Sequence, residues 1–247
     1  MQQQAVFDFD GVLMDSVHEV AVTAFRCITK ETPTSLAQLP EHYLKNLLTN
    51  RHLVQPAGDF IVFARWCLDT HSVAELESKK FQGLLAREPQ PLAERTKYFF
   101  STRSKFIQEN RDAWLALHQP FEPIWSEFKR RASELYIVTY KNAAAVLELT
   151  AFFGLNFPTH RLYAGERGIK KSQHLQVIMG TEPQALWFID DSIQNLEAIN
   201  NELGPELTQI SLAHASWGYV HPSDQLKATE LKIPVLSQTD VIQLLNQ

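Results

Sequence analysis

The sequence predicts an α/β protein: a Rossmann-like, doubly wound parallel sheet core with an inserted all-helical cap subdomain. Two observations lead to this prediction. Short apolar runs alternate with helix-patterned segments, which is the order that produces a parallel sheet covered by helices on both faces. Between the first two of these runs lie roughly 120 residues rich in helix formers, far more than an ordinary connection between strands needs.

Composition restricts the class of function. The 247 residues suffice for a core domain with a smaller insert, and a hydrophobic share of 45% is typical of chains that bury a core. The net charge of −5 lacks the basic excess of nucleic-acid-binding proteins. We therefore expect no nucleic-acid partner, although a small anionic substrate is compatible with this charge.

Cysteine usage and hydropathy indicate a cytoplasmic protein. Cys27 and Cys67 are too few for a disulfide framework and show no metal-ligand spacing. The N-terminal segment lacks the basic residue of a signal peptide, and no stretch approaches the ~20 apolar residues of a membrane span. We expect reduced thiols and no membrane association.

Five apolar runs are predicted to be strands. The first covers residues 5–9 and ends in acids and a glycine, the second covers 135–139, and the third, 185–189, ends at Asp190-Asp191. The remaining expected elements are a helix after the third strand that stops at Gly204-Pro205, a fourth strand at 207–212, a short fifth strand at 234–236 and a terminal helix at 240–245.

The long insert is predicted to be helical. Helix-patterned segments occur at 20–28, 43–48, 60–68, 73–85 and 95–117, with prolines between several of them. We place the cap at residues 16–100 and the α/β core at residues 1–15 and 101–247.

Polar residues end three of the predicted strands: Asp8 with Asp10, Thr139, and Asp190 with Asp191. In parallel sheets, ligands bind beyond the carboxyl ends of the strands. Clustered carboxylates repel one another unless a cation joins them, and magnesium selects hard oxygen ligands. The pattern therefore indicates a cation site at this edge, although acids at a helix start are also favoured by the helix dipole.

The spacing of Asp8 and Asp10 suits acid–base chemistry. Residues two apart in an extended chain point the same way, so both carboxylates can face one site. One carboxylate can remain ionised and attack, while the other holds a proton and gives it to the leaving group. Gly11 permits a sharp turn directly afterwards. The same four residues also occur in ordinary surface turns, so their context decides.

Several side chains could bind a phosphate. The Thr139 hydroxyl and the free N–H groups of the following helix suit phosphate oxygens, although an ordinary capping threonine has the same sequence. Lys170 or Lys171 could neutralise a phosphoryl group, although neighbouring lysines often face solvent. Lys141 could reach the phosphate or face solvent, and the sequence leaves both alternatives open.

In this order, the four segments resemble the motifs of the haloacid dehalogenase superfamily, in its phosphatase branch with a helical cap between the first and second motifs. The resemblance covers about residues 1–15 and 120–247. The matching residues are Asp8-Phe9-Asp10-Gly11-Val12-Leu13-Met14-Asp15-Ser16, Thr139, Lys170 or Lys171, Ile189-Asp190-Asp191-Ser192-Ile193-Gln194-Asn195, and the tripeptide Trp217-Gly218-Tyr219. The chain departs from the pattern at Asp190, where many members have glycine, and neither lysine is followed by the proline that many relatives carry.

The resemblance implies a role for each aspartate. Asp8 attacks phosphorus and forms an aspartyl-phosphate, and Asp10 protonates the leaving oxygen and then activates water. Mg²⁺ is held by Asp8, the backbone carbonyl of Asp10 and Asp191, with Asp190 as a further ligand or as a group that supports the ligands.

The resemblance also implies a set of phosphate-binding residues. Thr139, Tyr140 and a lysine contact the phosphoryl oxygens. Lys171 is preferred over Lys170 because Leu175 and Ile178 then begin the helix at the expected distance.

The predicted function is a Mg²⁺-dependent phosphomonoester hydrolase acting on a small phosphorylated metabolite. Asp10 favours a phosphatase because a dehalogenase needs no acid for its leaving group. The alternatives are a phosphonate hydrolase or a phosphomutase of the same superfamily, and a non-catalytic phosphate-responsive regulatory protein on the same fold.

Overall fold

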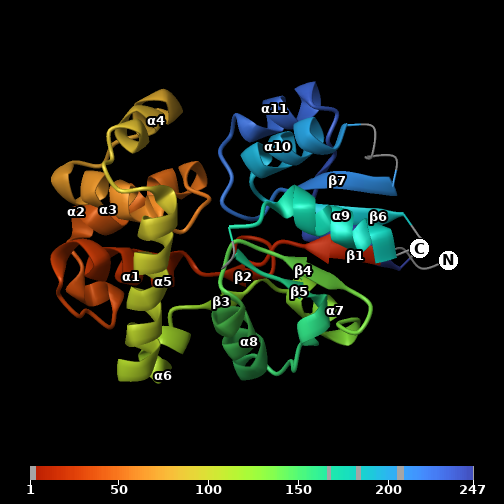
Figure 1. Ribbon diagram of the computed structural model, residues 1–247, viewed down its shortest axis with the longest axis horizontal. Helices are drawn as coiled ribbons and strands as arrows, with labels where there is room; N and C mark the ends of the chain where they lie inside the picture. The colour runs from red at the N-terminus through yellow and green to blue at the C-terminus, as the bar shows by residue number, and fades with distance from the viewer. Residues whose placement is uncertain (1–3, 166–167, 182–184, 205–208, 247) are drawn as a thin grey trace. The chain divides into compact units, whose positions relative to one another are not determined.

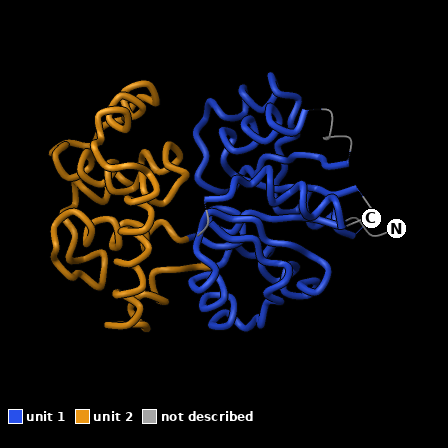
Figure 2. Tube along the Cα trace, viewed as in Figure 1, with its two compact units in different colours: residues 1–15, 120–247 blue, residues 16–119 orange. Residues whose placement is uncertain are grey.

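The computed structural model describes residues 4–165, 168–181, 185–204 and 209–246 (Figure 1). The chain divides into two compact units, which Figure 2 colours separately. Residues 1–15 and 120–247 form the first, which we call the sheet unit, and residues 16–119 form the second, the helical unit. Among the described helices, none combines the length and apolar character that crossing a membrane requires.

The sheet unit contains a six-stranded sheet with the order β5-β4-β1-β6-β7-β8, in which every pairing is parallel. Its strands are β1 (Gln4–Phe7), β4 (Tyr136–Val138), β5 (Leu162–Tyr163), β6 (Leu186–Asp190), β7 (Ile210–Ala215) and β8 (Val235–Leu236). The chain builds outward from β1 on one side and then returns to its other side with β6. The strand order therefore reverses next to β1, which is where open α/β sheets bind their ligands.

Alternating residues of the strands face two separate apolar layers. Val6, Val138 and Phe188 belong to the cluster on one face, with residues of α9 (Lys171–Thr181) and α10 (Ile193–Leu203). On the other face, the ring of Phe7 meets Phe128 of α7 (Ile124–Arg130) edge-on at 5.5 Å. The remaining helices of this unit are α8 (Ala143–Phe152), α11 (Asp224–Glu230) and α12 (Gln238–Leu245). Apolar packing on both faces confirms the predicted doubly wound α/β fold.

The helical unit packs around buried aromatic side chains. Its helices are α1 (Val17–Thr29), α2 (Glu41–Asn50), α3 (Asp59–Asp69), α4 (Ser78–Ala86), α5 (Leu92–Glu109) and α6 (Arg111–Leu115). Tyr43, Phe63, Phe99 and Trp114 are fully buried. Two short strands, β2 (Met14–Asp15) and β3 (Gln119–Pro120), pair where the chain leaves the sheet unit and returns to it.

The predicted end of the cap at residue 100 is wrong. Residue 100 lies inside α5, which runs unbroken from Leu92 to Glu109, and the helical unit ends at Gln119. A unit cannot end in the middle of a helix whose buried face belongs to that unit's core. The predicted start at residue 16 agrees with the structure.

The strand boundaries also differ from the prediction, most clearly in the first and fourth strands. The first strand ends at Phe7 instead of residue 9, and the fourth ends at Ala215 instead of residue 212. Residues 205–208, which include the predicted helix stop at Pro205 and the predicted strand start at Leu207, lie outside the described residues. The two-residue strand β5 was not predicted because so short a run carries no period.

Candidate active site

Asp8 is the first residue beyond β1, near the centre of the sheet. Its backbone N–H donates to the carbonyl of Ile189 at 2.9 Å, which continues the pairing between β1 and β6 by one residue. Its carboxylate accepts from the backbone N–H of Phe9 at 2.7 Å and is buried. The carboxylate is therefore fixed at the edge of the sheet where ligands bind.

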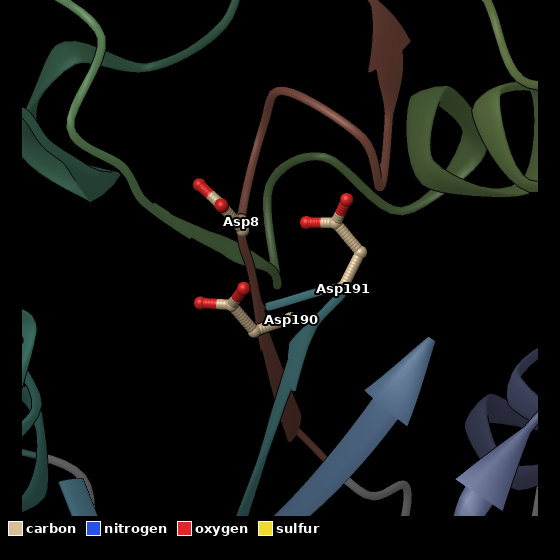
Figure 3. A group of neighbouring side chains, drawn as sticks. All are labelled: Asp8, Asp190 and Asp191. Carbon is tan, nitrogen blue, oxygen red and sulfur yellow. The ribbon is translucent and has the colours of Figure 1, made fainter. Parts of the chain in front are cut away.

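Three carboxylates meet at this point (Figure 3). Asp8, Asp190 and Asp191 each offer an oxygen, and these oxygens lie within 4.8 Å of one another in buried surroundings. Mg²⁺ takes oxygen ligands at ~2.0–2.1 Å in an octahedron, so opposite ligands are roughly 4 Å apart. The donor type and the spacing of this cluster therefore fit Mg²⁺.

Lys171 pairs with two of the three acids. Its Nζ lies 2.7 Å from Asp8 Oδ2 and 2.7 Å from Asp190 Oδ2. Burial raises the pKa of Asp8 to about 6, against the opposing effect of Lys171. Burial disfavours the charge on Lys171, but Asp190 and Asp8 outweigh it and raise the pKa of Lys171 above its ordinary value. The lysine is therefore a charged ammonium group whose positive charge favours the ionised form of Asp8, against the effect of burial.

Asp190 has hydrogen-bond partners on both oxygens. Oδ1 accepts from the backbone N–H of Ser192 at 2.8 Å, and Oδ2 accepts from Lys171 at 2.7 Å. The Asn195 amide nitrogen lies 3.4 Å from Oδ1 and 3.3 Å from Oδ2. These contacts hold Lys171 in place, and they favour a supporting role for Asp190 over direct ligation of a metal.

Asp191 is enclosed by backbone. Its Oδ2 accepts from the N–H of Tyr219 at 2.6 Å. A Cβ added at Gly11 would overlap the Asp191 carboxylate, and one added at Gly218 would overlap the Cβ of Asp191 and the carbonyl of Gly11. Gly11 also has a φ of +85°, which favours glycine. The two glycines therefore make the space that Asp191 occupies.

Asp10 lies outside the three-carboxylate cluster and has a lysine of its own. Lys141 Nζ lies 3.0 Å from Asp10 Oδ1, and the Lys141 side chain is 0% exposed. The sequence left open whether Lys141 reaches the phosphate or faces solvent. The structure excludes the second alternative and pairs the lysine with Asp10.

The predicted phosphate-binding residues lie beside the cluster, with one exception. Thr139 is buried directly after β4, and the ring of Tyr140 lies 5.0 Å from Lys171 Nζ. Lys170, in contrast, is 64% exposed at its side chain and pairs with Glu202 at 2.5 Å. The structure thus places Lys170 at the surface and Lys171, the preferred of the two lysines, beside the cluster.

Three contributors were missed from the sequence: the Asn195 amide, the Tyr219 backbone N–H and the pairing of Lys141 with Asp10. Asn195 and Tyr219 lie in segments that carry the family resemblance, but no role followed from the resemblance. Asn195 lies in the first turn of the helix after Asp190-Asp191, where a side chain can reach back to the end of the strand. That position is the signal that could have identified it.

Comparisons with known proteins support the fold. No model of a protein family matches the chain, and neither does any curated protein. A predicted phosphoglycolate phosphatase from Haemophilus somnus 129PT is 19% identical with a TM-score of 0.62, over 100% of this chain and 98% of that one. A predicted phosphatase from Clostridium acetobutylicum is 13% identical with a TM-score of 0.59, over 98% and 97% of the two chains. A haloacid dehalogenase-like family hydrolase from Streptococcus pneumoniae is 14% identical with a TM-score of 0.53, over 98% and 97%. The chain therefore has the fold of the haloacid dehalogenase-like hydrolases.

Proposed function

We propose that the chain is a Mg²⁺-dependent phosphomonoester hydrolase that forms an aspartyl-phosphate on Asp8. The observation that carries this proposal is the cluster of three buried carboxylates, with Lys171 bound to two of them. Carboxylates buried this close together repel one another, and a divalent cation between them would reduce that repulsion. The solved structures described as phosphatases support phosphoryl transfer as the reaction class.

The metal ligands would be Asp8, Asp191 and the backbone carbonyl of Asp10. Bound there, Mg²⁺ supplies positive charge that offsets the repulsion between the nucleophile and an anionic phosphoryl group. Gly11 and Gly218 pack directly against Asp191 and leave its carboxylate the space it occupies.

The reaction then divides between two aspartates. Asp8 attacks phosphorus while the bond from phosphorus to the leaving oxygen breaks, and Asp10 gives its proton to that oxygen. Water next attacks phosphorus and gives a proton to Asp10, the bond from phosphorus to Asp8 breaks, and inorganic phosphate leaves. Lys171 and Thr139 contact the phosphoryl oxygens, and Asp190 holds Lys171 in position.

The partner of this site is, on this proposal, a small phosphorylated metabolite. The same chemistry also serves phosphonate hydrolases and phosphomutases. A phosphonate hydrolase forms a Schiff base that borohydride traps in the presence of a carbonyl substrate, and a mutase depends on a bisphosphate. Both properties can be measured on the same protein preparation.

Turnover of p-nitrophenyl phosphate and a panel of phosphorylated metabolites tests the proposal. Wild type should require Mg²⁺, and Asp8→Asn should abolish turnover because it removes the nucleophile. Asp191→Asn should lower turnover by orders of magnitude and weaken Mg²⁺ binding measured by calorimetry, because it removes a ligand charge. Lys170→Met, on the exposed neighbour of Lys171, is the control and should behave as wild type.

Two results would contradict the proposal. If wild type is no faster than Asp8→Asn on every ester of the panel, the chain is not a phosphatase, and a non-catalytic regulatory role gains support. If Asp191→Asn has near-normal activity at limiting Mg²⁺, Asp191 is not a metal ligand.

A further inference from the structure

Lys141 is a buried ammonium group close to the reacting residues, and the steps above give it no role. It lies three residues beyond the end of β4, and its backbone is fixed on both sides. Its N–H donates to Thr139 Oγ1 at 3.2 Å, and its carbonyl accepts from the N–H of Gly165 at 3.1 Å. A Cβ at Gly165 would overlap the Tyr140 carbonyl, so the two loops pack closely. The direction of the Lys141 side chain is therefore determined by the fold.

The burial of Lys141 is costly without a specific partner. Lysines are almost never fully buried unless they are paired, because an ammonium group loses its hydration on burial. Here the partner is Asp10, whose Oδ1 lies 3.0 Å from Nζ. This ion pair joins two loops that are 131 residues apart in the sequence.

The ion pair with Lys141 restricts the orientation of the Asp10 side chain. Asp10 lies in the loop after β1, next to Gly11 with its φ of +85°, and its side chain is 18% exposed. A carboxyl group in a loop can rotate about both of its side-chain bonds. Fixing Oδ1 on a buried ammonium group limits that rotation and gives the other oxygen one direction.

The two buried lysines thus serve different aspartates. Lys171 pairs with Asp8 and Asp190, whereas Lys141 pairs with Asp10. Resting on the proposed function, we infer that Lys141 is a positioning residue for Asp10. It donates to Asp10 Oδ1 and thereby orients the other oxygen, which carries the proton that passes to the leaving group. Lys141 is not primarily a ligand of the phosphoryl group.

The nature of the leaving group separates these two roles. An alkyl phosphate expels a poor leaving group, which needs the proton from Asp10 as the phosphorus–oxygen bond breaks. p-Nitrophenyl phosphate expels a phenolate that is stable as an anion, so it needs the proton far less. Replacing a residue that binds the phosphoryl group would lower kcat/KM equally for both esters. Because kcat/KM reports the steps up to leaving-group departure, the later role of Asp10 with water does not affect the comparison.

The experiment measures kcat/KM of wild type and Lys141→Met on two esters, p-nitrophenyl phosphate and the alkyl phosphate that wild type turns over fastest. We expect a loss of about 100-fold on the alkyl phosphate and of only a few-fold on the aryl ester, in line with the usual size of general acid catalysis. Lys141→Arg, which keeps the charge, should recover most of the alkyl activity. Lys170→Met is the matched control and should leave both values unchanged.

A double-mutant cycle with Asp10→Asn completes the test. Asp10→Asn alone should show the same selective loss on the alkyl ester, and adding Lys141→Met should lower its activity by less than about twofold, because the two residues act as one unit. Thermal unfolding establishes that each variant is folded. If Lys141→Met does not fold, the losses of kcat/KM on the two esters are compared in Lys141→Gln instead.

Equal losses on both esters, or no loss on either, would overturn the inference. Additive losses in the double variant would also overturn it. Wild type is assayed before any variant. If it turns over no ester at all, the proposed function is contradicted, and so is the inference that rests on it.

Discussion

At the scale of single residues, the site requires glycine at two positions, where a side chain would overlap Asp191. Asp191 lies where the loop at Gly11 and the loop at Gly218 come together, and a methyl group on either glycine would occupy space that Asp191 already fills. The Tyr219 N–H then orients one carboxylate oxygen at 2.6 Å. The position of Asp191, the proposed metal ligand, is therefore set by close packing of the backbone at Gly11 and Gly218 and by the Tyr219 N–H.

Gly218→Ala should disturb this arrangement. The added methyl group meets backbone at Gly11 and the Cβ of Asp191, neither of which is the flexible end of a side chain. We expect a loss of about 1–3 kcal/mol in the free energy of unfolding, the usual cost of overpacking. We also expect Mg²⁺ to bind about tenfold more weakly in calorimetry, because the Tyr219 contact moves with the loop.

Gly180→Ala is the matched control for that substitution. Gly180 is exposed in α9, and a Cβ there has nothing within 4 Å. Replacing a helical glycine of this kind should stabilise the protein by about 0.5–1 kcal/mol without changing Mg²⁺ binding. Equal effects of the two substitutions on Mg²⁺ binding would show that the lack of a side chain at Gly218 is not what positions Asp191.

Residues at strand ends were predictable from the sequence, whereas residues set by side-chain direction were not. Asp8 and Asp191 follow apolar runs, and parallel strands bring their carboxyl ends to one edge. The choice between Lys170 and Lys171 depends on the residue at which α9 begins, which is the least predictable property of a helix. The contact between Lys141 and Asp10 depends on the packing of two distant loops, which no local pattern encodes.

At the scale of elements, a buried ion pair joins two helices of the helical unit. Glu19 of α1 accepts from Arg103 of α5 through both carboxylate oxygens at 2.9 Å, and from the Thr23 hydroxyl at 2.6 Å. The Glu19 side chain is 0% exposed. The pair fixes how α1 and α5 pack together, because a buried charge cannot slide away from its partner without losing its compensation.

Glu19→Gln should therefore destabilise the helical unit strongly. It leaves the Arg103 guanidinium buried without its compensating charge, which typically costs about 3–5 kcal/mol. Glu41→Gln removes one partner of the exposed Glu41–Lys45 pair in α2 and should change stability very little. Urea unfolding of both variants checks the contrast, and a similar small effect for both would show that the buried pair is not holding the helices.

The elements that sequence patterns predicted best are the long and strongly periodic ones. The segment at 60–68 lies within α3, and the one at 95–117 contains most of α5 and α6. The predicted helix at 73–85 begins only at Ser78. The cap boundary was misplaced for a different reason: composition does not change at residue 119, and only the return of the chain to the sheet marks the end of the insert.

At the scale of the whole molecule, buried histidines link stability to pH. Burial lowers the pKa of His174 below its ordinary value of 6.5. The unfolded chain therefore binds more protons than the folded protein as pH falls through and below 6.5, and the free energy of unfolding should fall with it. Above that range both states are neutral at this residue, so its contribution is complete and constant.

His174→Gln should reduce this pH dependence. The variant has no ionisable group at position 174, so its free energy of unfolding should fall less steeply than that of wild type between pH 7.5 and pH 5.5. Urea unfolding at several pH values in that range measures both slopes. Identical slopes for the two proteins would show that His174 does not contribute to acid sensitivity.

The place of β1 in the sheet has a consequence for the order of events during synthesis. β1 is complete when residue 7 has been added, but its neighbours β4 and β6 begin only at residues 136 and 186. The helical unit, a single uninterrupted stretch of chain, is made entirely within that interval and can fold as it emerges from the ribosome. β1, which ends one residue before Asp8, is thus translated before the other strands of the six-stranded sheet, yet it has no partner there until the whole insert has been translated.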